Sequence, residues 1–247
     1  MQIKLDLKKS LEKNAADYFE RAKKARRKKE GAIKIIKSVK EKIQEEAAEK
    51  EKQERVVVKK EWYEKFRWFF TSNNFLVIGG RDETTNDILI KKYLEENDVV
   101  FHTELAGSPF VIIKDGKKAE LLDLNEAAQF CACFSKAWKS GLATTEVYHV
   151  NSEQVSKEPI KKGAFMIYGK RSYYAPIMEL AIGNYNGKAF IGPKGAVEKH
   201  CNDFSIIVQG NEKKSDIAKK IAKQFNLDID DVIRVLPEGC KIKKVKK

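Results

Sequence analysis

The chemistry that this sequence could support begins with a glycine pair followed by an arginine. Gly79 and Gly80 come directly after the apolar run 75–78, and Arg81 and Asp82 follow them. A strand that enters such a pair can turn through a positive φ, or bring its backbone close to a phosphate that Arg81 would bind. The alternative is a tight turn with Arg81 and Asp82 on the surface. The spacing matches neither a Walker loop nor a dinucleotide-binding loop.

Amide, hydroxyl and cationic side chains form a second group along two predicted strands. The group consists of Gln154, Ser156, Lys157, Lys170 and Arg171. Such a mixture suits contacts with phosphate and ribose better than acid–base catalysis, although an exposed lysine that binds nothing is the alternative. Four tyrosines, Tyr148, Tyr168, Tyr173 and Tyr174, lie near these cations in the sequence. They could stack on unpaired bases or pack at the rim of the core.

The histidines and cysteines do not predict a catalytic or metal site. Any site around His102 would pair it with Glu104 or Ser108, and a histidine satisfied by a backbone partner is the alternative. The four cysteines include no Cys-x-x-Cys pair, so we expect reduced thiols. No nucleophile–base pair, metal-ligand set or nucleotide loop stands out in the sequence. The sequence therefore predicts no catalytic residue, no metal and no cofactor.

The charge of the chain predicts a polyanionic partner. Among 247 residues, 49 are Lys or Arg and 36 are Asp or Glu. Residues 1–60 hold 20 of these cations against 11 carboxylates. Nucleic acid and an anionic membrane surface are the candidates. No segment is apolar over the roughly 18 residues that span a bilayer, and no signal-peptide core follows Met1, so we expect a cytoplasmic protein without membrane contact.

The first quarter of the chain is typical of a long helix. Residues 8–60 contain no proline and one glycine, and apolar residues recur at steps of three and four from Leu11 to Ile43. This narrow stripe predicts a coiled-coil-like arm that needs a partner helix. The basic run 21–29 is either a solvated helix face or a contact with RNA.

A globular part is predicted to begin at Trp62, because five aromatic residues lie within residues 62–70 and must be mostly buried. We expect strands at 75–78, 99–102, 109–113, 146–150 and 165–168, near 178–182 and near 204–208. Helices are expected at 86–94, 126–139, 216–225 and 230–235, and a basic tail at 241–247. Asn125 is the expected N-cap of the second helix and Gly141 its C′ residue. This pattern predicts an α+β fold with a mixed or mainly antiparallel sheet and flanking helices, preceded by the long basic helical arm.

Several motifs, in this order, resemble the NFACT-R domain that closes proteins of the nuclear export mediator factor and fibronectin-binding protein A type. The motifs are Trp62-Tyr-Glu-Lys-Phe-Arg-Trp-Phe69, Leu76-Val-Ile-Gly-Gly-Arg-Asp82 with Asn86, Gln154-Val-Ser-Lys157 and Phe165-Met-Ile-Tyr-Gly-Lys-Arg171. The resemblance covers roughly residues 1–185. We therefore expect a coiled-coil arm at 1–60, an NFACT-R domain at 61–185 and an α/β extension at 186–247 that packs on it.

The resemblance implies an RNA-binding module of a ribosome quality control factor, without enzymatic activity of its own. Such a factor binds tRNA, ribosomal RNA and the obstructed large ribosomal subunit, and supports rescue or tailing of the nascent chain. An NFACT-N domain, on a separate chain or outside this sequence, would complete it. The implied RNA contacts are Arg81, His102, Gln154, Lys157, Lys170 and Arg171, beside a loop of Gly79, Gly80, Asp82 and Asn86.

One position departs from the family pattern, and two other functions remain as alternatives. Ala106 stands where family members usually have a histidine, which removes any two-histidine arrangement from that loop. An RNA-processing or RNA-modification enzyme or adaptor built on a standalone NFACT-R domain is the main alternative. A surface adhesin is disfavoured by the lack of a signal segment and by cysteines that read as reduced thiols.

Overall fold

The computed structural model describes residues 4–8, 10–52, 61–105 and 107–243, with the backbone alone for 41–52. The chain divides into two compact units, residues 1–59 and 60–247. The first unit contains one long helix, α1 (Leu11–Lys52). The segment before α1 folds back on its first turns: Asp6 N donates to Asn14 Oδ1 at 2.9 Å, and Tyr18 Oη donates to Lys4 O at 2.8 Å.

The predicted helical arm is confirmed over α1, which is shorter than the predicted range 8–60. Residues 53–60 lie outside the described residues. The apolar stripe of α1 is exposed, with Phe19 81% and Ile35 65% accessible. The partner helix that this stripe calls for stays a prediction.

The second unit is built on a six-stranded sheet in the order β1-β2-β4-β3-β5-β8. Its strands are β1 (Arg67–Phe70), β2 (Leu76–Gly79), β3 (Val99–Thr103), β4 (Val111–Ile113), β5 (Val147–Asn151) and β8 (Ser172–Tyr174). All neighbouring strands are antiparallel. The central strand β4 is buried along its whole length, so the core lies on both faces of the sheet.

A four-stranded antiparallel sheet and a two-stranded hairpin complete the β-structure. The larger sheet, in the order β10-β9-β11-β12, contains β9 (Glu179–Tyr185), β10 (Lys188–Gly192), β11 (Phe204–Gln209) and β12 (Cys240–Ile242). The hairpin pairs β6 (Val155–Lys161) with β7 (Ala164–Ile167). The predicted domain boundary at residue 185 falls at the end of β9, inside the four-stranded sheet.

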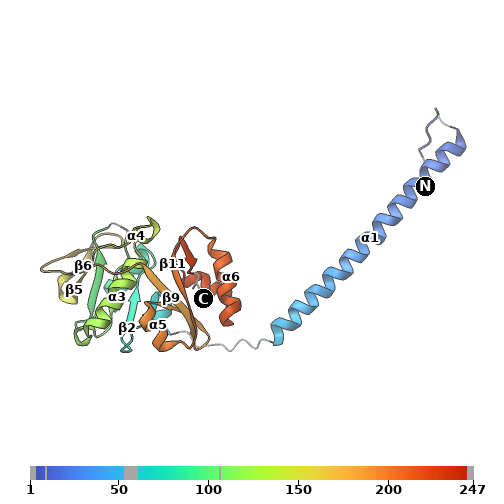
Figure 1. The fold of residues 1–247 in the computed structure, drawn as a ribbon. Helices are drawn as coiled ribbons and strands as arrows, with labels where there is room; N and C mark the ends of the chain where they lie inside the picture. The colour runs from blue at the N-terminus through green and yellow to red at the C-terminus, as the bar shows by residue number, and fades with distance from the viewer. Residues whose placement is uncertain (1–3, 9, 53–60, 106, 244–247) are drawn as a thin grey trace. The chain divides into compact units, whose positions relative to one another are not determined.

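Helices cover both sheets. They are α2 (Glu83–Ile88), α3 (Leu121–Cys133), α4 (Lys136–Lys139), α5 (Lys194–His200), α6 (Lys214–Phe225) and α7 (Ile229–Val235), with the short turns η1 (Trp62–Lys65), η2 (Leu89–Tyr93), η3 (Gly116–Lys118) and η4 (Ser152–Gln154). Helix α3 packs against β3, β4, β5 and β9, and α5 packs against β9, β10 and β11 (Figure 1). Aromatic rings join the two sheets, since Trp68 lies 5.6 Å from Phe190. The core of the second unit is therefore continuous.

The α+β fold with antiparallel sheets is confirmed, but the boundaries of two predicted helices were wrong. Helix α3 begins at Leu121 after Glu120, and Asn125 lies inside it, with Nδ2 donating to Leu121 O. The expected single helix ends at Cys133, because Ser135 caps α4 as a separate turn. Helix α2 begins at Glu83 instead of residue 86, since Asp82 accepts a hydrogen bond from Thr85 N at 2.8 Å.

Outside α2 and α3, the predicted elements agree with the structure only in part. Gly141 follows the last turn of α4 with φ +71°, as predicted for a C′ residue. Part of the predicted basic tail forms β12, and residues 244–247 lie outside the described residues. Strands β1, β6, β8 and β10 and helix α5 were not predicted. Within the described ranges no helix has the length and apolar character to cross a membrane.

Candidate functional site

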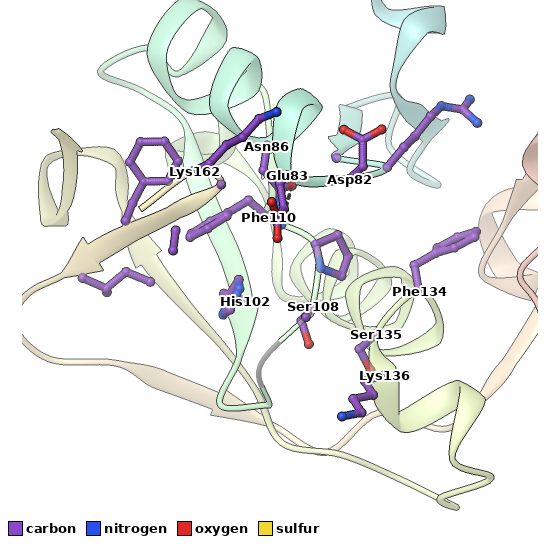
Figure 2. A pocket seen from close by; sticks show the side chains of 18 of the residues that line it. Asp82, Glu83, Asn86, His102, Ser108, Phe110, Phe134, Ser135, Lys136 and Lys162 are labelled. Atoms are coloured by element: carbon purple, nitrogen blue, oxygen red, sulfur yellow. Dashed lines mark hydrogen bonds between the residues drawn. The ribbon is translucent and has the colours of Figure 1, made fainter. Parts of the chain in front are cut away.

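A cleft of about 740 Å³ opens on the second unit (Figure 2). Its walls come from the turn between β2 and α2, the end of β3 with the loop that follows, the junction of α3 and α4, and the tip of the β6–β7 hairpin. Arg67 of β1, Tyr148 of β5 and Arg171 also line it. The cleft therefore joins segments that are distant in the sequence, which is typical of ligand sites.

Cations dominate the rim of this cleft. The lining contains Arg67, Arg81, Lys136, Lys139, Lys161, Lys162 and Arg171, against the carboxylates Asp82 and Glu83. Lys136, Lys161 and Lys162 are exposed, and none of the three forms an ion pair with a described residue. Because cations that are concentrated in a concave surface focus the electrostatic field, the cleft attracts anions.

The floor of the cleft is aromatic and firmly packed. Phe110 lies between His102, at 4.4 Å between ring centroids, and Phe165, at 5.7 Å. Figure 2 shows Phe110, His102 and Ser108 among the side chains that line the cleft. Phe110 and Phe165 are buried, so the floor is rigid and the rim supplies the groups that can move toward a ligand.

His102 reaches the cleft as an uncharged ring. Burial lowers its pKa, although hydrogen bonds with the backbone at Thr103 and Ser108 oppose the shift. The predicted partners are already engaged, because Ser108 Oγ donates to Leu105 O at 2.9 Å and Glu104 forms an ion pair with Arg171. His102 can therefore offer a ligand packing or a neutral hydrogen bond, but no positive charge near pH 7.

The glycine pair serves the protein's own packing. Neither Gly79 nor Gly80 has a positive φ. A Cβ on Gly80 would lie 1.8 Å from Asn86 Oδ1, which accepts a hydrogen bond from Phe110 N at 3.2 Å. The predicted close backbone approach is therefore made to the Asn86 side chain. Asn86 in turn fixes the turn after β2 against the strand end at Phe110.

Arg81 ties three segments of the second unit together. Its Nε donates to Lys65 O at 3.1 Å, Nη1 to Arg234 O at 2.8 Å and Nη2 to Phe66 O at 2.8 Å. Burial lowers the pKa of Arg81 to about 10, and repulsion from Arg234 and Arg67 adds to the shift. The guanidinium remains charged at neutral pH, with two of its five N–H donors unused by these carbonyls. Its first role in this geometry is to hold the cleft wall in place.

The other predicted contacts divide between the cleft and the outer surface. Gln154 Nε2 donates to Tyr168 O at 2.8 Å and to Lys170 O at 3.0 Å, so this amide shapes the loop after β7. Lys157 and Lys170 are exposed and do not line the cleft. Arg171 does line it, and its guanidinium lies 4.5 Å from the centre of the Tyr148 ring. The cleft thus gathers Arg81, His102 and Arg171 with Gly80, Asp82 and Asn86, and leaves out Gly79, Gln154, Lys157 and Lys170.

The four lysines of the cleft rim were not predicted as functional residues. Lys136 and Lys139 lie one helical turn apart on α4, directly after the cap Ser135. Lys161 and Lys162 precede Gly163 at the tip of the hairpin, whose N donates to Asp87 Oδ1 at 2.8 Å. A Lys-Lys-Gly turn between two strands was the available signal, and it required β6 to be recognised as a strand.

Within the described ranges, no group of three His, Cys, Asp or Glu side chains could hold a metal ion. Cys131 and Cys133 are buried free thiols, and burial raises the pKa of both well above that of an exposed cysteine. The cleft itself offers fixed positive charge over an apolar floor. That arrangement suits a ligand carrying several negative charges.

Comparison with known proteins identifies the same region. Residues 65–169 match the family described as the NFACT protein RNA binding domain. The chain is 40% identical over 200 residues to the archaeal Rqc2 homolog aRqcH of Methanocaldococcus jannaschii, a match that covers 75% of this chain and 30% of that protein. It is 37% identical over 180 residues to the ribosome quality control complex subunit NEMF of Mus musculus, covering 66% of this chain and 16% of that protein. The chain thus spans less than a third of the length of either relative.

A solved structure is also similar. It is the C-terminal part of the fibronectin/fibrinogen-binding protein from Streptococcus suis, with a TM-score of 0.42 and 19% identity over 51% of this chain and 49% of that one.

Proposed function

Because this chain belongs to the NFACT family, we propose that it is the RNA-binding part of a ribosome quality control factor and that RNA enters the cationic cleft. The proposed ligands are tRNA and ribosomal RNA of an obstructed large ribosomal subunit, where the factor supports rescue or tailing of the nascent chain. An NFACT-N domain, in the same protein or on another chain, would complete the factor. The proposed role is binding in the cytoplasm, without chemistry of its own.

The excess of cations in the cleft carries this proposal. Each lysine that neutralises a phosphate releases condensed counterions, so binding gains free energy from the entropy of those ions. Lys136, Lys161 and Lys162 have the required exposure and make no ion pair with a described residue. Their charges are therefore available to a phosphate backbone at little cost in broken contacts.

The shape of the site favours RNA over an anionic membrane, the other candidate for a basic chain. Phe110 lies at the floor of a concave cleft, beneath a rim that includes the hairpin tip at Lys162. A flat layer of lipid headgroups can contact the rim but cannot follow it inward. A nucleic-acid backbone is narrow and flexible enough to enter.

The predicted residues divide into two proposed roles. Arg81 and Gln154 use their side chains on backbone carbonyls, so we assign them to holding the cleft and its neighbouring loop in shape. Arg171 lines the cleft and would contact RNA directly. Lys157 and Lys170 are exposed beyond the cleft and would add contacts to the phosphate backbone outside it.

The test compares two triple variants of equal charge. The cleft variant is Lys136→Gln, Lys161→Gln, Lys162→Gln, and the control is Lys92→Gln, Lys199→Gln, Lys223→Gln, which neutralises three exposed lysines outside the cleft lining. The affinity for tRNA is measured by fluorescence anisotropy over a range of salt concentrations. The cleft variant should lose up to about three units of the slope of log affinity against log salt.

The control variant should keep a slope close to that of the wild-type chain. Equal slopes for the two variants would show that the cleft is not where phosphates bind. Co-sedimentation of both variants with large ribosomal subunits gives a second measurement with the proposed partner, in which the cleft variant should be the weaker binder.

A further inference from the structure

A second group of charges lies where the cleft meets the extension 186–247. Glu238, in the loop between α7 and β12, forms an ion pair with Lys139 of α4, and Lys139 lines the cleft. The hydrogen bond from Lys139 lowers the pKa of Glu238 most, and the positive charges of Lys139, Lys214 and Arg67 lower it further. Lys139 of α4 therefore contacts this carboxylate directly, and the charges of Arg67 of β1 and Lys214 of α6 act on it.

The positive charges of Arg67 and Lys214 act on each other and repel. The guanidinium of Arg67 lies 4.8 Å from the centre of the Phe134 ring, and its Nη1 donates to Gly80 O. Burial lowers the pKa of Arg67 to about 10. Burial also lowers the pKa of Lys214, and repulsion from Arg67 and Arg81 acts in the same direction. A nearby anion would favour the charged forms of both side chains.

The position of Lys214 on its helix points the same way. Lys213 is the N-cap of α6 and Lys214 is its first residue, where the helix dipole favours anions and disfavours cations. Glu238 raises the pKa of Arg67 and Lys214, and Asp82 raises the pKa of Arg67 and Arg81, so these two carboxylates oppose the effect of burial on the cluster. The side chain of Glu238 is 67% exposed and lies in the loop between α7 and β12, outside any helix or strand. It therefore balances the cluster only in part.

We propose that Arg67, Lys139 and Lys214 form a phosphate subsite that continues the cleft onto the C-terminal extension, and that Glu238 occupies this subsite in the free protein. A phosphodiester carries one negative charge on two oxygens, as a carboxylate does, so an RNA phosphate can replace Glu238 without changing the charge of the cluster. The side chain of Glu238 is 67% exposed, so it can leave Lys139 without disturbing the core. This inference rests on the proposed function, because RNA in the cleft reaches the subsite past Lys139.

The subsite predicts opposite signs for two substitutions. Lys214→Gln should weaken binding of a short single-stranded RNA about fivefold and reduce the salt slope by about one unit, because one phosphate contact is lost. Glu238→Gln should strengthen binding about threefold, because the internal competitor is removed. Lys214→Arg should restore most of the affinity, which separates the loss of charge from a change in the fold.

Matched controls account for the change in net charge. Lys223→Gln removes an exposed cation from the same helix, and Glu212→Gln removes an exposed carboxylate that pairs with Lys220. Both controls should change the affinity less than the variants of the subsite. Thermal unfolding of each variant shows whether the fold is retained.

The outcomes separate this inference from the proposed function. If the wild-type chain binds RNA, the triple cleft variant binds weakly, and Lys214→Gln behaves as Lys223→Gln does, the subsite is refuted and the cleft stands. Weaker binding by Glu238→Gln also overturns the subsite, since Glu238 would then support the site instead of competing for it. If the wild-type chain fails to bind RNA at low salt, the proposed function falls and the subsite falls with it.

Discussion

The hairpin tip that carries Lys161 and Lys162 should depend on a single glycine, and Gly163→Ala tests this. Gly163 has φ +75°, and its N donates to Asp87 Oδ1 at 2.8 Å. A Cβ at this position would lie 2.7 Å from Glu83 Cα, which is backbone and cannot rotate away. The substitution should therefore lift the tip from α2 and displace both lysines from the rim of the cleft.

The expected magnitude follows from two terms. An alanine held at a positive φ costs roughly 1 kcal/mol, and the loss of a surface hydrogen bond to a carboxylate costs about 1 kcal/mol more. Strands β6 and β7 form a two-stranded sheet of their own, so lifting the tip relieves the strain without unfolding the six-stranded sheet. A shift of about 2 kcal/mol toward the lifted tip would lower the affinity for RNA by at most about thirtyfold.

The control is Gly187→Ala, in the turn between β9 and β10. Gly187 has φ +80°, but an added Cβ would meet no atom within 4 Å. This variant should show the cost of positive φ alone, with unchanged RNA affinity. Hydrogen exchange of residues 161–164 and tRNA anisotropy measure the two effects. Equal exchange and equal affinity in the two variants would refute the role of the hairpin tip.

Three further predictions concern the second unit. Burial raises the pKa of Glu126, although this carboxylate accepts two hydrogen bonds from Ser72. The folded state therefore favours the protonated form, and the free energy of unfolding falls as pH rises above about 4.5. Glu126→Gln should gain stability relative to wild type between pH 4 and pH 7, which urea titrations at each pH measure. The hydrogen bond from Gly163 lowers the pKa of Asp87. The amides of the hairpin tip should therefore be protected from hydrogen exchange at neutral pH, and this protection should be lost as pH falls below about 3.8. Asp87→Asn should remove this acid dependence of hydrogen exchange. Arg81→Met should reduce the free energy of unfolding by about 2 kcal/mol, because three carbonyls lose their donor, and an unchanged urea midpoint would refute the structural role of Arg81.

The fold class could be predicted because its signals are local. Short apolar runs separated by turn residues predicted the antiparallel strands, and the aromatic run at residues 62–70 predicted burial, which Phe66, Trp68 and Phe69 confirm. Strand β1 was missed because adjacent residues of this run are both buried, so the alternation that marks a half-buried strand is absent. The start of α3 was misplaced because Glu120 and Asp123 form a reciprocal capping box that a search for an Asn or Ser cap overlooks.

The cleft could not be predicted in the same way, because it depends on pairing between distant segments. Lys157 and Lys161 lie on the same strand, four residues apart, and alternation alone would give them equivalent positions. The register of β6 against β7 shifts on both sides of Pro159. Only Lys161 then lies in the cleft lining, and Lys157 lies outside it. Pro159, which cannot donate a hydrogen bond to the neighbouring strand, marks an irregular strand in the sequence, but it does not give the register.

The role of Arg81 shows a limit of a different kind. A cation in a motif can bind a ligand or the protein's own backbone, and the sequence does not distinguish these uses. The carbonyls of Lys65, Phe66 and Arg234 meet the guanidinium only after two sheets have packed together. Substitution of a motif residue that shapes the cleft should lower the free energy of unfolding. Substitution of an exposed rim lysine should instead reduce the salt dependence of RNA binding. The two groups are therefore separated by measuring unfolding and RNA affinity on the same set of variants.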